Sequence, residues 1–124
     1  MNLFNTHGPC RGISLLRWGN LTMELWFCPP GYRIEEHSHP HEDIELVFLW
    51  GEALFKSTSK RKGNLSQSFY ATSPHDTLKH FTVESGDVHS FVVSRKWLVF
   101  LNIARWKDGY IPTSAAKDFQ VTLN

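Results

Sequence analysis

The stretch GYRIEEHSHPHEDIELVFLWG, from Gly31 to Gly51, concentrates side chains that bind metal ions. Three histidines alternate at His37, His39 and His41, and an apolar run follows the acidic residues and ends at Gly51. In an extended segment, residues two apart share a face, so His37 and His39 are expected to point into the same volume. Imidazole and carboxylate groups together suit zinc, iron, manganese or nickel. The stretch therefore predicts a metal site on a β-strand.

A second stretch, FTVESGDVHSFVV, completes this pattern later in the chain. Gly86 lies in a turn, and His89 begins a run in which apolar and polar residues alternate. Alternation with a period of two is typical of a half-buried strand. A histidine at the start of such a strand indicates a third imidazole for the same site.

The two stretches resemble the two motifs of the cupin superfamily. The first motif is a glycine, five residues, His-x-His, three or four residues, Glu, six residues and a glycine; Gly31, His37, His39 and Gly51 match it. The second is Pro-x-Gly-x-x-His, which Gly86 and His89 match, whereas Glu84 occupies the proline position. The resemblance covers roughly residues 20 to 104. It implies an all-β fold, the cupin-type double-stranded β-helix or jelly-roll barrel, and a divalent transition metal (Fe, Mn, Zn or Ni).

The resemblance implies a metal held by His37, His39, His89 and one carboxylate, and the carboxylate is the point of departure. Ile44 occupies the position at which the motif has Glu, and Asp43 and Glu45 lie on either side of it. We predict Glu45 as the ligand because it continues the odd-numbered face of the histidines. A bulge that favours Asp43, and a site with no carboxylate, remain open. A rival register pairs His39 with His41 and keeps Glu45.

Length and composition limit the domain count and the partners. The chain has 124 residues, enough for one cupin domain over residues 1–124, with a core at about 13–104. A formal net charge of +1 gives no reason to expect nucleic acid or an anionic membrane as partner. The chain has no apolar run of membrane-spanning length, so we expect a cytoplasmic protein. Two isolated cysteines, Cys10 and Cys28, do not predict a disulfide.

Turn signals and alternating apolar residues predict about nine short strands. Residues 1–12 are expected to form an irregular lead-in, residues 56–64 a solvated hairpin tip, and residues 114–118 a short helical turn. Strands are expected at residues 13–18, 21–28, 32–41, 44–50, 53–58, 65–71, 77–83, 89–94 and 97–104. Many short strands of this kind favour a sandwich or a small barrel.

The strand after the histidines also suggests an assembly. If Glu45 points into the barrel, the alternate residues point outward, namely Ile44, Leu46, Phe48 and Trp50. Soluble monomers rarely leave such an apolar row in water. We therefore expect a homodimer in which the two rows meet across a two-fold axis.

Three functions are consistent with these motifs. The first is a metal-dependent enzyme, of oxygenase or isomerase type, that acts on a small polar substrate. The second is a non-catalytic module that binds a small molecule or a sugar, and the third is a structural jelly-roll assembly protein. The sequence identifies no catalytic residue; His80 and Tyr70 are candidates for an acid or base. Fold analogy does not decide among the three functions.

Overall fold

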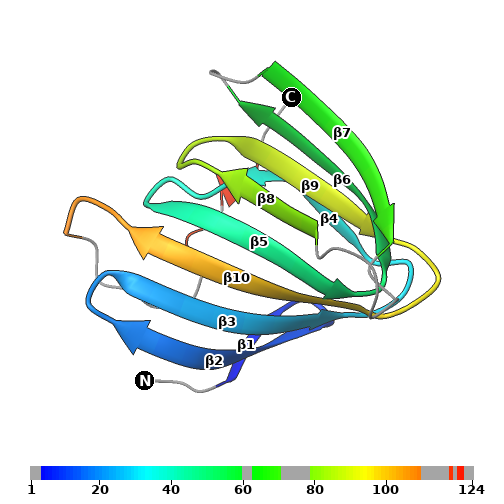
Figure 1. Cartoon of the computed structure of the whole chain (residues 1–124), viewed down its shortest axis with the longest axis horizontal. Coiled ribbons are helices and arrows are strands. Elements are labelled where there is room, and N and C mark those ends of the chain that lie inside the picture. The colour runs from blue at the N-terminus through cyan, green and yellow to red at the C-terminus, as the bar shows by residue number, and fades with distance from the viewer. Residues whose placement is uncertain (1–3, 60–62, 71–78, 110–117, 119, 122–124) are drawn as a thin grey trace.

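The computed structural model describes residues 4–59, 63–70, 79–109, 118 and 120–121, and these residues form two antiparallel sheets (Figure 1). The six-stranded sheet has the order β1 (Phe4–His7), β2 (Cys10–Trp18), β3 (Leu21–Cys28), β10 (Leu98–Trp106), β5 (Glu42–Trp50) and β8 (Lys79–Val83). The five-stranded sheet has the order β11 (Gln120–Val121), β4 (Arg33–Ser38), β9 (Val88–Val93), β6 (Glu52–Ser59) and β7 (Gly63–Tyr70). The described residues contain no helix that could cross a membrane.

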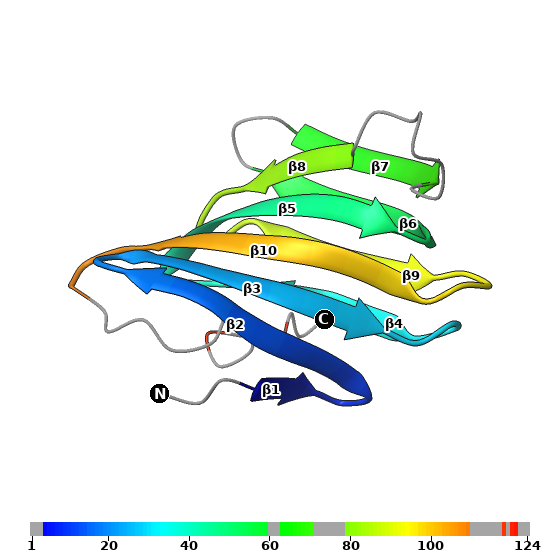
Figure 2. The ribbon, with the colours of Figure 1, turned by 60° about the horizontal axis from the view of Figure 1, so that its bottom comes forward.

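The two sheets face each other and enclose the core, as the view in Figure 2 shows. One half of this core is a cluster of phenylalanines around Phe48, whose ring lies 5.5–6.2 Å from four other rings: Phe55, Phe81, Phe91 and Phe100. These separations are typical of packed aromatic pairs. The all-β fold predicted from the sequence is confirmed.

The predicted orientation of β5 is wrong. Ile44, Leu46 and Phe48 are 0%, 2% and 0% exposed and point into the core, whereas Glu45 is on the outer face. A turn at Pro40 and His41 separates β4 from β5 and changes which residue numbers point inward. The prediction carried the odd-numbered face of the histidines through this turn, although the alternation holds only within a continuous strand.

This correction removes the reason given for a homodimer. The apolar row is covered within one chain, apart from Trp50, which is 46% exposed at the end of its strand. The homodimer stays a prediction that sedimentation at micromolar concentration would test, and so does the cytoplasmic location.

The beginning of the chain is more regular than predicted. Residues expected to form an irregular lead-in form β1 and the start of β2, which pair from Phe4 with Ile13 to His7 with Cys10. β3 has the predicted bounds, but its more polar face is the buried one: Thr22 and Glu24 are 4% and 2% exposed. The inner surface of the six-stranded sheet is therefore polar near one end.

The later elements agree with the expected turns. β6 and β7 form the predicted hairpin, with Ser59 opposite Gly63, and its tip lies outside the described residues. The predicted helical turn also lies outside them, except for Asp118. The closing glycine of the first motif, Gly51, has φ +105°, and a side chain there would collide with the backbone of Trp97. Only glycine meets both demands.

Candidate metal centre

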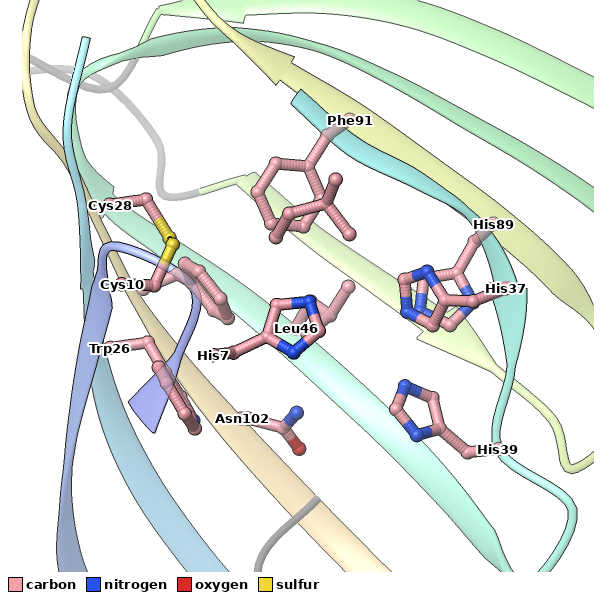
Figure 3. Close-up of a pocket in the computed structure, with 12 residues that line it drawn as sticks. His7, Cys10, Trp26, Cys28, His37, His39, Leu46, His89, Phe91 and Asn102 are labelled. Carbon is pink, nitrogen blue, oxygen red and sulfur yellow. The ribbon is translucent and has the colours of Figure 1, made fainter. Parts of the chain in front are cut away.

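Three histidines from two neighbouring strands converge inside the barrel (Figure 3). His37 of β4 lies directly opposite His89 of β9, and His39 follows at the end of β4. One nitrogen from each ring lies within 4.8 Å of the other two, a separation that one metal ion can bridge. The three side chains belong to residues that are only 3–5% exposed. The structure thus brings together the three histidines that the sequence singled out.

The second nitrogen of each ring contacts a backbone carbonyl. Nδ1 of His37 lies 2.7 Å from the carbonyl oxygen of Glu35, and Nδ1 of His89 lies 3.5 Å from that of Asp87. Nδ1 of His39 donates to the carbonyl oxygen of Asp118. A carbonyl only accepts, so each Nδ1 carries the proton and each Nε2 keeps its lone pair. This is the tautomer in which a histidine binds a metal through Nε2.

Burial keeps two of these rings neutral. It lowers the pKa of His37 to about 2, with further lowering from His89 and His39. It lowers the pKa of His89 to about 3, and His39 adds to the effect. Metal binding requires neutral imidazoles, so both rings are ready to bind at neutral pH.

The buried carboxylate of the site belongs to Glu42, which the sequence analysis did not select. Its Oε2 lies 3.7 Å from Nδ1 of His39, and the residue is fully buried. Burial, followed by a side-chain hydrogen bond and charge repulsion with Asp118, raises the pKa of Glu42 to about 10. The sequence signal was available, because Glu42 follows His39 by three residues, but an uninterrupted alternation would have turned it outward.

The structure does not bring Glu45, the predicted ligand, to the histidines. Its side chain is 52% exposed and lies 3.6 Å from His80 on the outer face of the sheet. Asp43 accepts a hydrogen bond from the backbone nitrogen of Ser85 at 2.8 Å and pairs with Lys107 at 3.2 Å. Both acids therefore act at the surface, and the inward position between them is occupied by Ile44, which was predicted to point outward.

The other candidates also lie elsewhere. His41 of the rival register bonds Asp118 through Nδ1 at 2.8 Å and is not one of the three converging histidines. His80 is on the outer face with Glu45, and the side chain of Tyr70 lies outside the described residues.

A cavity of about 50 Å³ adjoins the three histidines. Its remaining walls are mainly apolar and include Trp26, Leu46, Phe91 and Phe100, with the two cysteines at one end (Figure 3). Two polar side chains also line it, His7 from β1 and Asn102 from β10. His7 belongs to the segment expected to form an irregular lead-in, and nothing in the sequence around it shows that its strand lines the cavity.

Comparison with known proteins rests on the fold, because no family model and no curated protein matches the sequence. An uncharacterized protein with a double-stranded β-helix domain from Klebsiella pneumoniae superposes with a TM-score of 0.63 at 18% identity, covering 86% of this chain and 84% of that one. The cupin domain of Cnp3 from Schizosaccharomyces pombe gives 0.64 at 11% identity, over 79% and 61%. The chain has the cupin fold. KdgF from a Halomonas species is a further neighbour of this cupin-fold protein, with a TM-score of 0.68 at 8% identity over 86% and 87%.

Proposed function

We propose that this cupin-fold protein holds one divalent transition metal on His37, His39 and His89. The observation that carries the proposal is the convergence of three buried imidazoles whose Nδ1 atoms all face backbone carbonyls. Iron, manganese, zinc and nickel all accept such nitrogen ligands. In this proposal Glu42, and not Glu45, is the acidic side chain beside the site, and it lies on the Nδ1 side of His39.

We further propose that the protein is a metal-dependent enzyme, of oxygenase or isomerase type, acting on a small polar molecule. A bound metal would supply a Lewis acid or a binding site for oxygen next to the cavity. Asn102 lines the cavity, and its side-chain oxygen has no hydrogen-bond partner among the described residues. A buried acceptor of this kind favours a ligand that brings a hydroxyl or amine donor. The cavity volume favours a substrate of few atoms.

His7 is the residue best placed for proton transfer beside the proposed metal. It lines the cavity without being one of the three converging histidines, and burial lowers its pKa from 6.5. A neutral imidazole at neutral pH is suited to act as a general base. His7→Phe should therefore preserve metal binding and reduce turnover.

A non-catalytic binding module is the second candidate. The observation that favours it is the apolar character of the walls, in which Trp26 and Phe91 offer aromatic surfaces to a small ligand. Under this function, His7→Phe would alter ligand affinity alone, and no reaction would accompany ligand binding.

Metal content tests the proposed function. Protein purified without added metal, then loaded with Zn²⁺, Mn²⁺, Fe²⁺ or Ni²⁺ and desalted, should retain about one ion per chain by elemental analysis. His89→Ala should lose the ion, whereas His80→Ala, a matched change at the outer face, should keep it. Equal retention by wild type and His89→Ala would place the ion elsewhere, and a wild-type protein that retains none would refute the proposed function.

A further inference from the structure

The last described segment of the chain runs along the strand that carries the histidines. β11 pairs antiparallel with β4, Gln120 opposite Ser38 and Val121 opposite His37 (Figure 1). Asp118, two residues before this strand, is 4% exposed. The C-terminal segment thus reaches the metal centre from 79 residues along the chain.

Asp118 makes three contacts with the turn that follows β4. Its Oδ1 accepts from Nδ1 of His41 at 2.8 Å, and its Oδ2 accepts from the backbone nitrogen of His41 at 2.9 Å. Its backbone carbonyl accepts from Nδ1 of His39. The carboxylate of Asp118 therefore fixes this residue to His41, and the backbone carbonyl of Asp118 is thereby held against His39.

His39 differs from the other two ligands in the origin of its carbonyl partner. His37 and His89 each use a carbonyl two residues earlier along the chain, which the local backbone supplies. His39 uses the carbonyl of Asp118, which is available only when the C-terminal segment is docked. Without it, Nδ1 of His39 loses this acceptor, although Glu42 Oε2 still lies 3.7 Å from the same nitrogen, and the ring is held less firmly in one tautomer and orientation.

The acidic side chain of Asp118 indicates that this contact does more than fix the C-terminal segment to the barrel. Asp118 lies with Glu42 and His39 in a group whose ligand atoms are all within 4.8 Å. Placing two carboxyl groups together in a buried site is costly, whereas an apolar side chain would fix a tail at less expense. A second acid beside the ligand is explained if it orients that ligand.

We propose that Asp118 is a positioning residue that holds His39 as an Nε2 ligand and thereby couples docking of the C-terminal segment to metal affinity. The inference rests on the proposed function, since it concerns the same site. Because such coupling is reciprocal, a bound metal strengthens docking of the segment by the factor by which docking strengthens metal binding.

Two measurements on the full-length protein test this inference. Zn²⁺ affinity, measured by competition with a chromogenic chelator, should fall about 10–100-fold in Asp118→Ala, the usual effect of losing a partner behind a ligand. The ¹⁵N shifts of the metal-free protein should show His39 protonated at Nδ1 in wild type and as a mixture of tautomers in the variant. Asp118→Asn, which keeps the size and one acceptor oxygen, should give smaller changes of the same sign and serves if Asp118→Ala does not fold. Glu36→Ala, an exposed acid on β4, is the matched control.

The outcomes separate the inference from the proposed function. An unchanged His39 tautomer in the Asp118 variants would overturn the inference, whatever the affinity shows. Unchanged Zn²⁺ affinity with an altered tautomer would also overturn it, because the coupling would be absent. If wild-type protein binds no Zn²⁺, the proposed function loses its support, and the tautomer alone then decides whether Asp118 positions His39.

Discussion

His37 and His89 lie directly opposite each other on antiparallel strands, with ring centroids 4.1 Å apart. Cross-strand neighbours have the shortest separation that a sheet offers to two side chains. The register of β4 and β9 is irregular between Ile34 and His37, so a local bulge sets where the first ring points. Two of the three proposed ligands are thus placed by strand pairing itself.

The stability of the metal-free protein should be highest near pH 6.5. The folded-state pKa values of His37 and His89 are about 2 and about 3, below the ordinary value of 6.5, so the unfolded chain binds more protons as the pH falls below 6.5. Stability conferred by their neutral forms is present above 6.5 and is lost toward acid, by up to about 1.4 kcal/mol per pH unit and group.

Glu42 makes the opposite contribution to the pH dependence of stability. Its pKa rises from 4.5 to about 10 on folding, so its contribution is present below 4.5 and is lost as the pH rises toward 10. Below pH 6.5 the combined effect of His37 and His89 on stability exceeds that of Glu42. Above pH 6.5 only Glu42 changes the stability with pH. Urea unfolding in the presence of a chelator, between about pH 5 and pH 9, should therefore show a maximum. Glu42→Gln should remove the decline on the alkaline side and steepen the loss of stability below pH 6.5; an equal alkaline decline in this variant would contradict the assignment.

Substituting the acids of β5 should separate Glu42 from the predicted ligand Glu45. Glu42→Gln changes a buried group 3.7 Å from His39 and should lower metal affinity measurably. Glu45→Gln changes an exposed group on the other face and should leave affinity unchanged. Isothermal titration with Zn²⁺ compares the two, and a larger loss in Glu45→Gln would mean that β5 faces the other way in solution.

Phe48 and Trp50 should differ sharply in their effects on stability. Phe48 is fully buried among four aromatic rings, so Phe48→Ala should cost about 3–5 kcal/mol of unfolding free energy. Trp50 is 46% exposed, so Trp50→Ala should cost considerably less. Denaturant titration gives both values. Similar costs would indicate that Trp50 is covered in solution, for example in the predicted homodimer.

The two cysteines should resist thiol reagents while the protein is folded. Cys10 and Cys28 are 1% and 0% exposed free cysteines whose side chains lie next to each other. The Cys10 thiol and burial raise the pKa of Cys28 well above its usual range, which removes the reactive thiolate. Mass spectrometry after iodoacetamide treatment should show almost no labelling in buffer and double labelling in urea. Rapid labelling of the folded protein would mean that this end of the barrel opens.

The sequence predicted those parts of the molecule that depend on local pattern. The strand from Leu21 to Cys28 has the expected bounds, and His37 and His39 are brought together by their local spacing, whereas His89 joins them through the pairing of β4 with β9. Glu42 was missed because the turn at Pro40 and His41 changes which residues of β5 point inward. The periodicity of the sequence does not show this change.

Long-range pairing accounts for the remaining differences. His7 lines the cavity because β1 pairs with β2, and Asp118 reaches His39 because β11 pairs with β4. Neither residue lies in a motif, and both contacts join segments whose closeness no local pattern specifies. The inward position of Glu45 and the outward apolar row that begins at Ile44 were both predicted from one assumed orientation of β5. Because that orientation was wrong, both positions were wrong.

The turn at Pro40 and His41 also restricts how this chain can change in length. Deleting one residue there would exchange the two faces of β5, sending Phe48 to water and Glu45 into the barrel, unless a bulge absorbed the change. Removing two residues would keep the faces and shift only the register along the strand. Natural insertions and deletions between His39 and Glu42 should therefore add or remove two residues at a time. This holds although neither Pro40 nor His41 is one of the three converging histidines.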